Sequence, residues 1–270
     1  MFIILSLLAA ALYLVSACLP LTQRTASAVA TAVAWLLHGS ALAADMVGSD
    51  SLRIGFASVL SATLWISVAA YWLENRNLTL DGLRVLVLPS AALAALLPMA
   101  FPGVLVPLQG QTALFPWHVA IAILAYSTLT IAAFHAVLMA LQESRLHSPH
   151  DSLRSAGWLN AAIDRLPALL TMERLLFRLI SFGFILLTLT VLSGIVFSEY
   201  LFGKPIKWDH KTVFTLLSWV LFGALLAGRF WRGWRGKLAL RFTLTGFATL
   251  LLAYVGTRFV LEVVLHRGIA

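Results

Sequence analysis

Histidines are the side chains of this sequence most able to bind a metal or carry a proton inside a membrane. The chain has seven histidines and one cysteine. His118 follows Phe115-Pro116-Trp117 and opens a long, nearly uncharged apolar segment. Its imidazole is therefore expected where a membrane helix meets water. A polar, metal-competent side chain is costly there and usually has a partner, so His118 is the first candidate for a site.

The composition predicts an integral membrane protein. Hydrophobic residues make up 61% of the chain and charged residues only 11%, whereas soluble domains carry about 25% charged residues. The mean hydropathy is +0.93. The net charge of +8 is explained by basic residues retained on the cytoplasmic side of a membrane, so no nucleic-acid partner is predicted. Cys18 stands alone, which excludes an intramolecular disulfide, a CxxC pair and a zinc cluster.

Runs of about 20 apolar residues, the length that spans a membrane, predict the elements that position these side chains. Eight such runs occur, at 2–20, 26–44, 54–73, 83–101, 117–142, 174–198, 212–230 and 242–264. The first lacks a preceding basic residue and a small-x-small cleavage site, so it is interpreted as a retained helix rather than a signal peptide. Pro89 and Pro98 should kink the fourth unless neighbouring helices satisfy the freed carbonyls.

The predicted fold class is an all-α polytopic membrane protein with about eight transmembrane helices. One integral membrane domain is expected to cover residues 1–270. Its N-terminal half would contain four helices within 1–101, and its C-terminal half four more within 117–270. No Ser/His/Asp set, phosphate loop or supported carboxylate pair is found, so no catalytic residue is assigned.

The basic residues predict the orientation in the membrane. With eight helices both termini share a side, and that side holds Arg53, Lys204, Lys207, Lys211, Arg258 and Arg267. The other side holds Arg24, Arg76, Arg84, Arg145, Arg154, Arg165, Arg174, Arg178, Arg229, Arg232, Arg235, Lys237 and Arg241. Since the richer side is normally cytoplasmic, both termini should face the outer, periplasmic side of a bacterial inner membrane.

Sorted by depth, two histidines share the outer face. His118 opens the fifth predicted helix and His266 closes the eighth. Trp208 and Asp209 lie in the outer loop between the sixth and seventh helices. Two neutral imidazoles across an aromatic-lined gap are what a six-coordinate heme iron requires. The spacing alone also suits two ordinary interfacial histidines, so both alternatives remain open.

Two further histidines lie within predicted helices. His38 is in the outer half of the second helix and is either a packing residue or an alternative ligand or proton carrier. His135 is 17 residues beyond His118, about 26 Å along the same helix, and should lie near the cytoplasmic face as a packing or snorkelling residue.

Several short motifs carry a resemblance to a known family. They are Trp117-His118-Val119, Ala125-Tyr126, Leu192-Ser193-Gly194, Trp208-Asp209 with Lys211, Trp219, Gly233-Trp234-Arg235-Gly236 and Tyr254-x-Gly256. With these motifs the chain from His118 onward resembles the CcsA/CcmC superfamily of heme-handling cytochrome c assembly proteins. It is most similar to the YpjD branch, with HemX as another relative. Trp35-x-x-His38 in the N-terminal half is also similar to that branch.

The resemblance implies a heme site at the outer face. In that superfamily a tryptophan-rich loop ending in Asp forms a platform for heme, and two flanking histidines ligate the iron. It implies that His118 and His266 are the metal ligands of a b-type heme and that Trp208 and Asp209 shape the site. His38 is kept as a further cofactor-binding candidate. Lysines that could pair with the heme propionates are Lys204, Lys207 and Lys211.

Departures from the family pattern leave the function open. The tryptophans that normally precede the Asp are Phe197, Phe202 and Ile206 here, the following Pro is His210, and an intramembrane histidine of the family falls on Ala227. The leading hypothesis is a heme-handling inner-membrane protein of cytochrome c assembly that contacts lipid and acts through a partner membrane protein. The alternative is a heme-free scaffold or regulator that controls such a partner, as HemX-like relatives suggest. A membrane cytochrome b is a third, but His38 and His135 lie at different depths and form no second heme-ligand pair.

Overall fold

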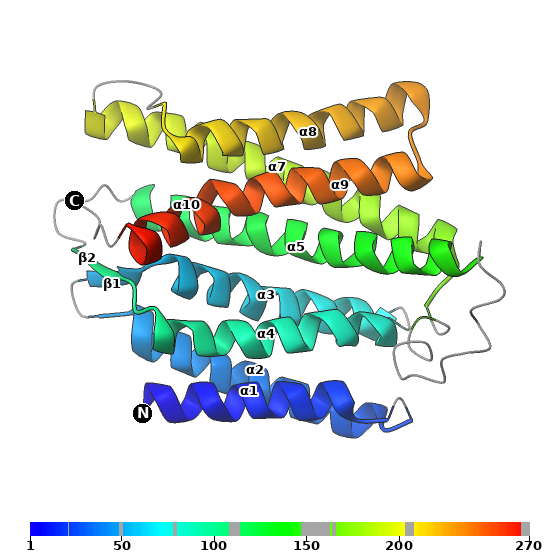
Figure 1. Ribbon diagram of the computed structural model, residues 1–270, viewed down its shortest axis with the longest axis horizontal. Helices are drawn as coiled ribbons and strands as arrows, with labels where there is room; N and C mark the ends of the chain where they lie inside the picture. The colour runs from blue at the N-terminus through cyan, green and yellow to red at the C-terminus, as the bar shows by residue number, and fades with distance from the viewer. Residues whose placement is uncertain are drawn as a thin grey trace.

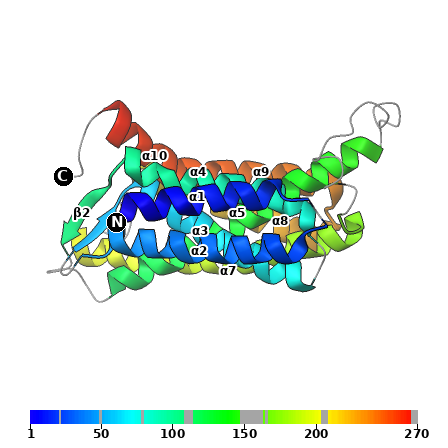
Figure 2. The ribbon, with the colours of Figure 1, turned by 90° about the horizontal axis from the view of Figure 1, so that it is seen from below.

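Long helices that run side by side along one axis make up most of the computed structural model (Figures 1 and 2). The structure describes residues 1–20, 22–48, 51–77, 80–107, 114–146, 163, 166–202 and 208–265. Backbone groups in lipid must bond within their own segment, which favours helices throughout an apolar chain. The predicted all-α, polytopic membrane fold is confirmed.

The N-terminal half contains four of the predicted helices. They are α1 (Phe2–Cys18), α2 (Arg24–Met46), α3 (Phe56–Asn77) and α4 (Arg84–Ala100), the last preceded by the 3-10 turn η1 (Asp81–Leu83). α1 has 17 residues and is shorter than the seven described helices whose length and apolarity suit a membrane span. α4 is helical throughout and includes both Pro89 and Pro98.

The C-terminal half contains the other four. They are α5 (Leu114–Leu146), α7 (Leu169–Phe202), α8 (His210–Arg232) and a last helix in four parts. The parts are α9 (Gly236–Leu251), the π-helical turn η3 (Leu252–Gly256), α10 (Thr257–Phe259) and the π-helical turn η4 (Val260–Val264). Gly233, with φ of 66°, ends α8 in the left-handed conformation that glycine adopts most readily.

A small sheet, which the sequence analysis did not predict, closes one end of the bundle. β1 (Ser51–Ile54) pairs antiparallel with β2 (Val104–Pro107), and Ser51 faces Pro107 while Ile54 faces Val104. The backbones of Gly55 and Gly103 touch where the strands begin to diverge, since a Cβ on either would lie 2.7 Å from the other's backbone. We call this end of the bundle the sheet end and the other the opposite end.

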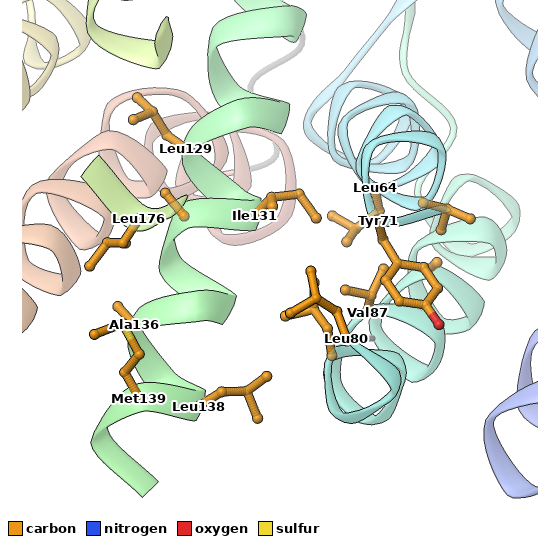
Figure 3. Packing of buried hydrophobic residues seen from close by; sticks show 14 of the residues in the cluster. Leu64, Tyr71, Leu80, Val87, Leu129, Ile131, Ala136, Leu138, Met139 and Leu176 are labelled. Carbon is orange, nitrogen blue, oxygen red and sulfur yellow. The ribbon is translucent and has the colours of Figure 1, made fainter. Parts of the chain in front are cut away.

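The hydrophobic core is centred on α5, which lies between the two halves. α5 packs against α3 on one side and against α7 and α9 on the other. Figure 3 shows Ile131 and Leu138 of α5 directed toward the side of Leu64 and Leu80, while Leu176 of α7 lies on the other side. α5 therefore joins the two halves and carries His118 at one of its ends.

Both ends of the described chain lie at the sheet end (Figure 1). α1 begins there and η4 ends there, which fits an even number of crossings. Most described basic residues belong to the opposite end, where the helix pairs α1–α2, α3–α4 and α8–α9 turn. The assignment of the opposite end to the cytoplasm stays a prediction from this charge distribution.

Candidate functional site

His118 lies near the start of α5 and contacts α7. The half-buried imidazole has its Nδ1 2.8 Å from the Ser193 hydroxyl. The same hydroxyl lies 3.1 Å from the Thr190 carbonyl oxygen, to which it can donate its single proton. When the hydroxyl makes this bond, Nδ1 of His118 is the donor to Ser193. In the neutral ring this leaves the lone pair on Nε2, the state in which imidazole binds a metal through that atom.

The next residue of α7 leaves space for the ring. A Cβ added to Gly194 would lie 3.5 Å from Cε1 of His118, so the helix backbone and the imidazole are already in close packing. The Leu192-Ser193-Gly194 motif, which contributed to the family resemblance, is thus the surface against which His118 is held. The motif is recognisable in the sequence, but this contact is not predicted from it. The sequence feature that could have indicated the contact is Gly194 next to Ser193, at the same predicted depth as His118.

Two tryptophans are exposed at the same end of the bundle. Trp117 is 70% exposed beside His118, and Trp208 is 72% exposed just before α8. Asp209 is the N-cap of α8, where its Oδ1 accepts from the Thr212 backbone N–H at 2.9 Å and the Thr212 hydroxyl at 3.0 Å. Asp209 thus orders the start of α8, and the exposed Trp208 directly precedes it.

Several predicted site residues lie outside the part of the chain that the structure describes. These are His266, Lys204 and Lys207, together with the side chains of Phe197, Phe202 and Ile206. The role of His266 as the second iron ligand therefore stays a prediction from the sequence. So does the structure of the loop in which the family carries its tryptophans.

His38 lies apart from this group, in the packing of α1, α2 and α3. Its side chain is 1% exposed. Nε2 is 2.8 Å from the Ser61 hydroxyl and Nδ1 is 3.4 Å from the Tyr13 hydroxyl. Both ring nitrogens therefore contact protein groups of two neighbouring helices, which suits a residue that orders their packing.

A tryptophan pair lies one turn from His38. Trp35 and Trp65 stack at 4.8 Å with their planes 8° apart. Each indole N–H donates to the other's backbone carbonyl, at 3.0 and 2.9 Å. Gly39 permits this approach, since a Cβ there would lie 2.8 Å from the Trp65 ring. The Trp-x-x-His motif of the N-terminal half therefore packs α2 against α3.

His135 makes a buried hydrogen-bond contact with a carboxylate, which the sequence did not predict. It is fully buried, as a packing residue was expected to be, and its Nε2 lies 3.0 Å from Oε2 of Glu74 on α3. Glu74 was the signal available in the sequence, because a carboxylate in an apolar helix usually has an intramembrane partner.

No group of three or more His, Cys, Asp or Glu side chains suited to a metal ion occurs among the residues that the structure describes. A heme iron needs only one or two axial side chains, so this finding bears on free metal ions rather than on heme. A hollow of about 300 Å³ opens at the opposite end, between α5 and α9, away from His118. It is lined by Ala140, Glu143, Ser144, Lys237, Leu240, Arg241 and Leu244.

Comparison with known proteins identifies relatives over nearly the whole chain. The family model described as "Cytochrome C assembly protein" matches residues 1–265. The inner membrane protein YpjD of Escherichia coli strain K12 is 26% identical over 254 residues, which cover 89% of this chain and 88% of that protein. The cytochrome c biogenesis protein CcsA of Prochlorococcus marinus strain SARG is 29% identical over 190 residues, covering 61% of this chain and 60% of its own. No solved protein structure is significantly similar to this chain.

Proposed function

Because this chain belongs to the family of cytochrome c assembly proteins, we propose that it is a heme-handling protein of the bacterial inner membrane that binds a b-type heme at the sheet end. Membership of the family implies heme handling by a multi-pass membrane protein. The similarity to an inner membrane protein of Escherichia coli supports that location. The basic residues at the opposite end support a periplasmic sheet end.

The single observation that carries this proposal is the hydrogen bond between His118 and Ser193. It holds the imidazole in place, and in the tautomer with Nδ1 as donor the ligating lone pair is on Nε2. Hydrogen bonding of the second ring nitrogen is the usual way in which proteins orient a metal-binding histidine. His118 would supply one ligand of the iron, and His266 is proposed as the other.

The remaining residues of the proposed site provide an aromatic surface for the porphyrin and fix the local backbone. Trp117 and Trp208 offer exposed aromatic faces at the sheet end, on which a porphyrin can stack. Asp209 keeps Trp208 at the start of α8 through its cap. Heme is the cargo of assembly in this proposal, and the chain's own residues bind it, orient it and release it. His38 would act at a distance by ordering α1, α2 and α3.

The test is the absorption spectrum of the purified protein, as isolated and after addition of hemin. Wild-type protein should show a Soret band and, when reduced, the α band of a bis-histidine b-type heme. We expect both bands to be lost or shifted in His118→Ala and His266→Ala. His210→Ala is the matched control, because His210 is exposed at the same end and has no proposed role. A wild-type protein that is colourless and does not bind added hemin would contradict the proposal.

A second candidate function is favoured by the altered loop before Asp209. Phe197, Phe202 and Ile206 stand where the family carries tryptophans, which reduces the aromatic surface available to heme. The chain would then act as a scaffold or regulator of a partner membrane protein. Co-purification of a defined membrane protein with a heme-free chain, unaffected by His118→Ala, would favour this function over the first.

A further inference from the structure

The last helix carries a charged group inside its membrane-spanning part. Arg258 lies in α10 and Glu262 one turn later, with Nη1 and Oε1 3.8 Å apart. Their side chains are only 12% and 13% exposed. Ionisable side chains are rare and costly inside membrane spans, and they usually mark a functional site. Neither the iron ligation nor the tryptophans of the proposed heme site uses this pair.

Two cations approach the same tyrosine from different helices. The guanidinium carbon of Arg258 lies 5.8 Å from the centre of the Tyr254 ring, and Nζ of Lys211 lies 5.9 Å from it. Lys211 comes from the start of α8. Among the described residues of this cluster there are two cations and one carboxylate, Glu262, which lies next to Arg258. The cluster of Lys211, Tyr254, Arg258 and Glu262 therefore carries a positive excess, which favours an anion.

Hydrogen-bond donors of the cluster remain to be satisfied. The buried hydroxyl of Tyr254 and the buried Nε of Arg258 have no hydrogen-bond partner among the residues that the structure describes, and neither does Oε1 of Glu262, which lies 3.8 Å from Arg258. A buried polar atom without a partner costs free energy, and an arginine commonly binds a carboxylate by donating two parallel hydrogen bonds to it. The nearby Tyr254 hydroxyl supplies a third hydrogen-bond donor for the same carboxylate.

A hydrogen bond between α5 and α9 fixes the depth of this cluster. The Tyr126 hydroxyl donates to the Leu250 carbonyl oxygen at 2.9 Å. Tyr126 is eight residues from His118, and Leu250 is eight residues from Arg258 on a helix that runs the opposite way. Eight residues correspond to about 12 Å of helix, so Arg258 lies near the depth of His118.

The backbone around Arg258 is irregular. The π-helical turns η3 and η4 bracket the three residues of α10, and the Thr257 hydroxyl donates to the Leu252 carbonyl oxygen at 3.0 Å. π-helical turns are rare and occur frequently at functional sites, because each inserts a residue and rotates the side chains that follow. Figure 1 shows α10 at the same end of the bundle as the starts of α5 and α8.

We propose that Arg258, Tyr254 and Lys211 form a carboxylate-binding site that holds a propionate of the porphyrin ligated by His118. The inference rests on the proposed function and adds a second point of recognition to it. Arg258 donates to the carboxylate through its guanidinium, Tyr254 through its hydroxyl, and Lys211 contributes charge from α8. Glu262 orients Arg258 through their ion pair.

The test compares three porphyrins on the purified full-length protein. Hemin carries iron and two propionates, its dimethyl ester has no free carboxylate, and iron-free protoporphyrin keeps the propionates but cannot be ligated by His118. Affinities are measured by Soret titration or by quenching of tryptophan fluorescence. The variants are Arg258→Gln, Arg258→Lys, Lys211→Gln and His118→Ala. Arg232→Gln is the control, since Arg232 is exposed at the opposite end.

We expect Arg258→Gln to weaken the binding of hemin and of iron-free protoporphyrin by roughly tenfold or more, as for loss of a charge-assisted hydrogen bond. The ester should bind wild type and Arg258→Gln equally, and Arg258→Lys should restore part of the affinity. Lys211→Gln should act in the same direction more weakly. His118→Ala should abolish the ligated hemin spectrum and leave protoporphyrin binding unchanged.

The contrary outcomes distinguish the carboxylate site around Arg258 from the proposed iron ligation by His118. If wild type binds hemin and its ester equally, or if Arg258→Gln weakens both alike, the carboxylate site is wrong while iron ligation stands. If wild type binds none of the three porphyrins, the proposed function fails and this inference fails with it. If Arg258→Gln does not fold, the comparison of the two iron porphyrins on wild type and on Lys211→Gln still decides the question.

Discussion

At the scale of single residues, the Ser193 hydroxyl orients the His118 ring through a hydrogen bond. Ser193 has one proton, and the nearby Thr190 carbonyl accepts it. In that arrangement Nδ1 of His118 donates to Ser193, and the lone pair is on Nε2. The same contact limits rotation of the ring, so Nε2 keeps one direction. Orientation of this kind typically changes metal affinity by about ten- to a hundredfold.

Ser193→Ala tests this role of the hydroxyl. It should lower the affinity for hemin by roughly tenfold and shift the heme spectrum or midpoint potential, because the imidazole loses the hydrogen-bond partner that orients it. Ser193→Thr, which keeps the hydroxyl, should restore most of the affinity. Ser181→Ala on the same helix is the control, since its hydroxyl donates to the Phe177 carbonyl of its own helix. Equal behaviour of the two alanine variants would rule out the orienting role.

His38→Ala distinguishes a packing histidine from a heme residue. The substitution removes contacts to Tyr13 and Ser61 and leaves buried hydroxyls, so we expect the free energy of unfolding to fall by about 1–3 kcal/mol. The measurement is thermal unfolding in detergent. The hemin spectrum of the folded variant should equal that of wild type. Loss of the heme bands at a temperature where the variant is folded would instead make His38 part of the heme site.

At the scale of elements, one carboxylate joins three segments at the opposite end. Glu173 of α7 is 7% exposed. Its Oε1 lies 2.9 Å from Arg229 near the end of α8 and 2.8 Å from Arg235 in the turn before α9. Arg229 also stacks on the Phe177 ring at 4.6 Å. The basic run between α8 and α9, interpreted from sequence as a membrane anchor, thus also fixes how α7, α8 and α9 meet.

Glu173→Gln should destabilise this junction. The amide keeps the shape but loses the charge, so two arginines lose their shared partner and the free energy of unfolding should fall by about 2 kcal/mol. Arg232→Gln, in the same basic run but exposed, should stay within about 0.5 kcal/mol of wild type. The two variants are compared by thermal unfolding in the same detergent. Equal stability would show that the ion pairs add little beyond the packing around them.

At the scale of the whole molecule, the chain is asymmetric along the membrane normal. The sheet end carries β1, β2, His118 and the cluster around Arg258, whereas the opposite end carries most of the described basic residues. α5 connects the two ends and the two halves. This arrangement suits a protein that receives its ligand on one side and is anchored by charge on the other.

Cysteine labelling in whole cells tests this orientation. In a Cys18→Ala background, Leu105→Cys at the sheet end should react with a membrane-impermeant maleimide, because Leu105 is 56% exposed in β2. Lys237→Cys at the opposite end, also exposed, should react only after the cells are lysed. The reverse pattern would place the sheet end in the cytoplasm and would remove the periplasmic assignment of the heme site.

The sequence by itself determined the elements and the class of the protein. The fourth predicted span, 83–101, is the helix α4 with its 3-10 turn over 81–100, and the sixth, 174–198, lies within α7. This agreement has a simple cause. In lipid every backbone group must bond within its own segment, so apolarity and length suffice to predict a helix. The position of His118 near the start of a helix followed from the same argument.

Which side chains meet was decided only by the tertiary structure. His118 finds Ser193 across 75 residues, and His135 finds Glu74 across 61. Apolar residues surround most of each helix, so hydropathy does not show which face of α5 turns toward α7. Helices in lipid associate through close packing of small residues and through interhelical hydrogen bonds rather than through an apolar stripe. Those contacts, at Gly194, Ser193 and Tyr126, exist only once the helices are placed side by side, and they decide the orientation of His118 and the depth of Arg258.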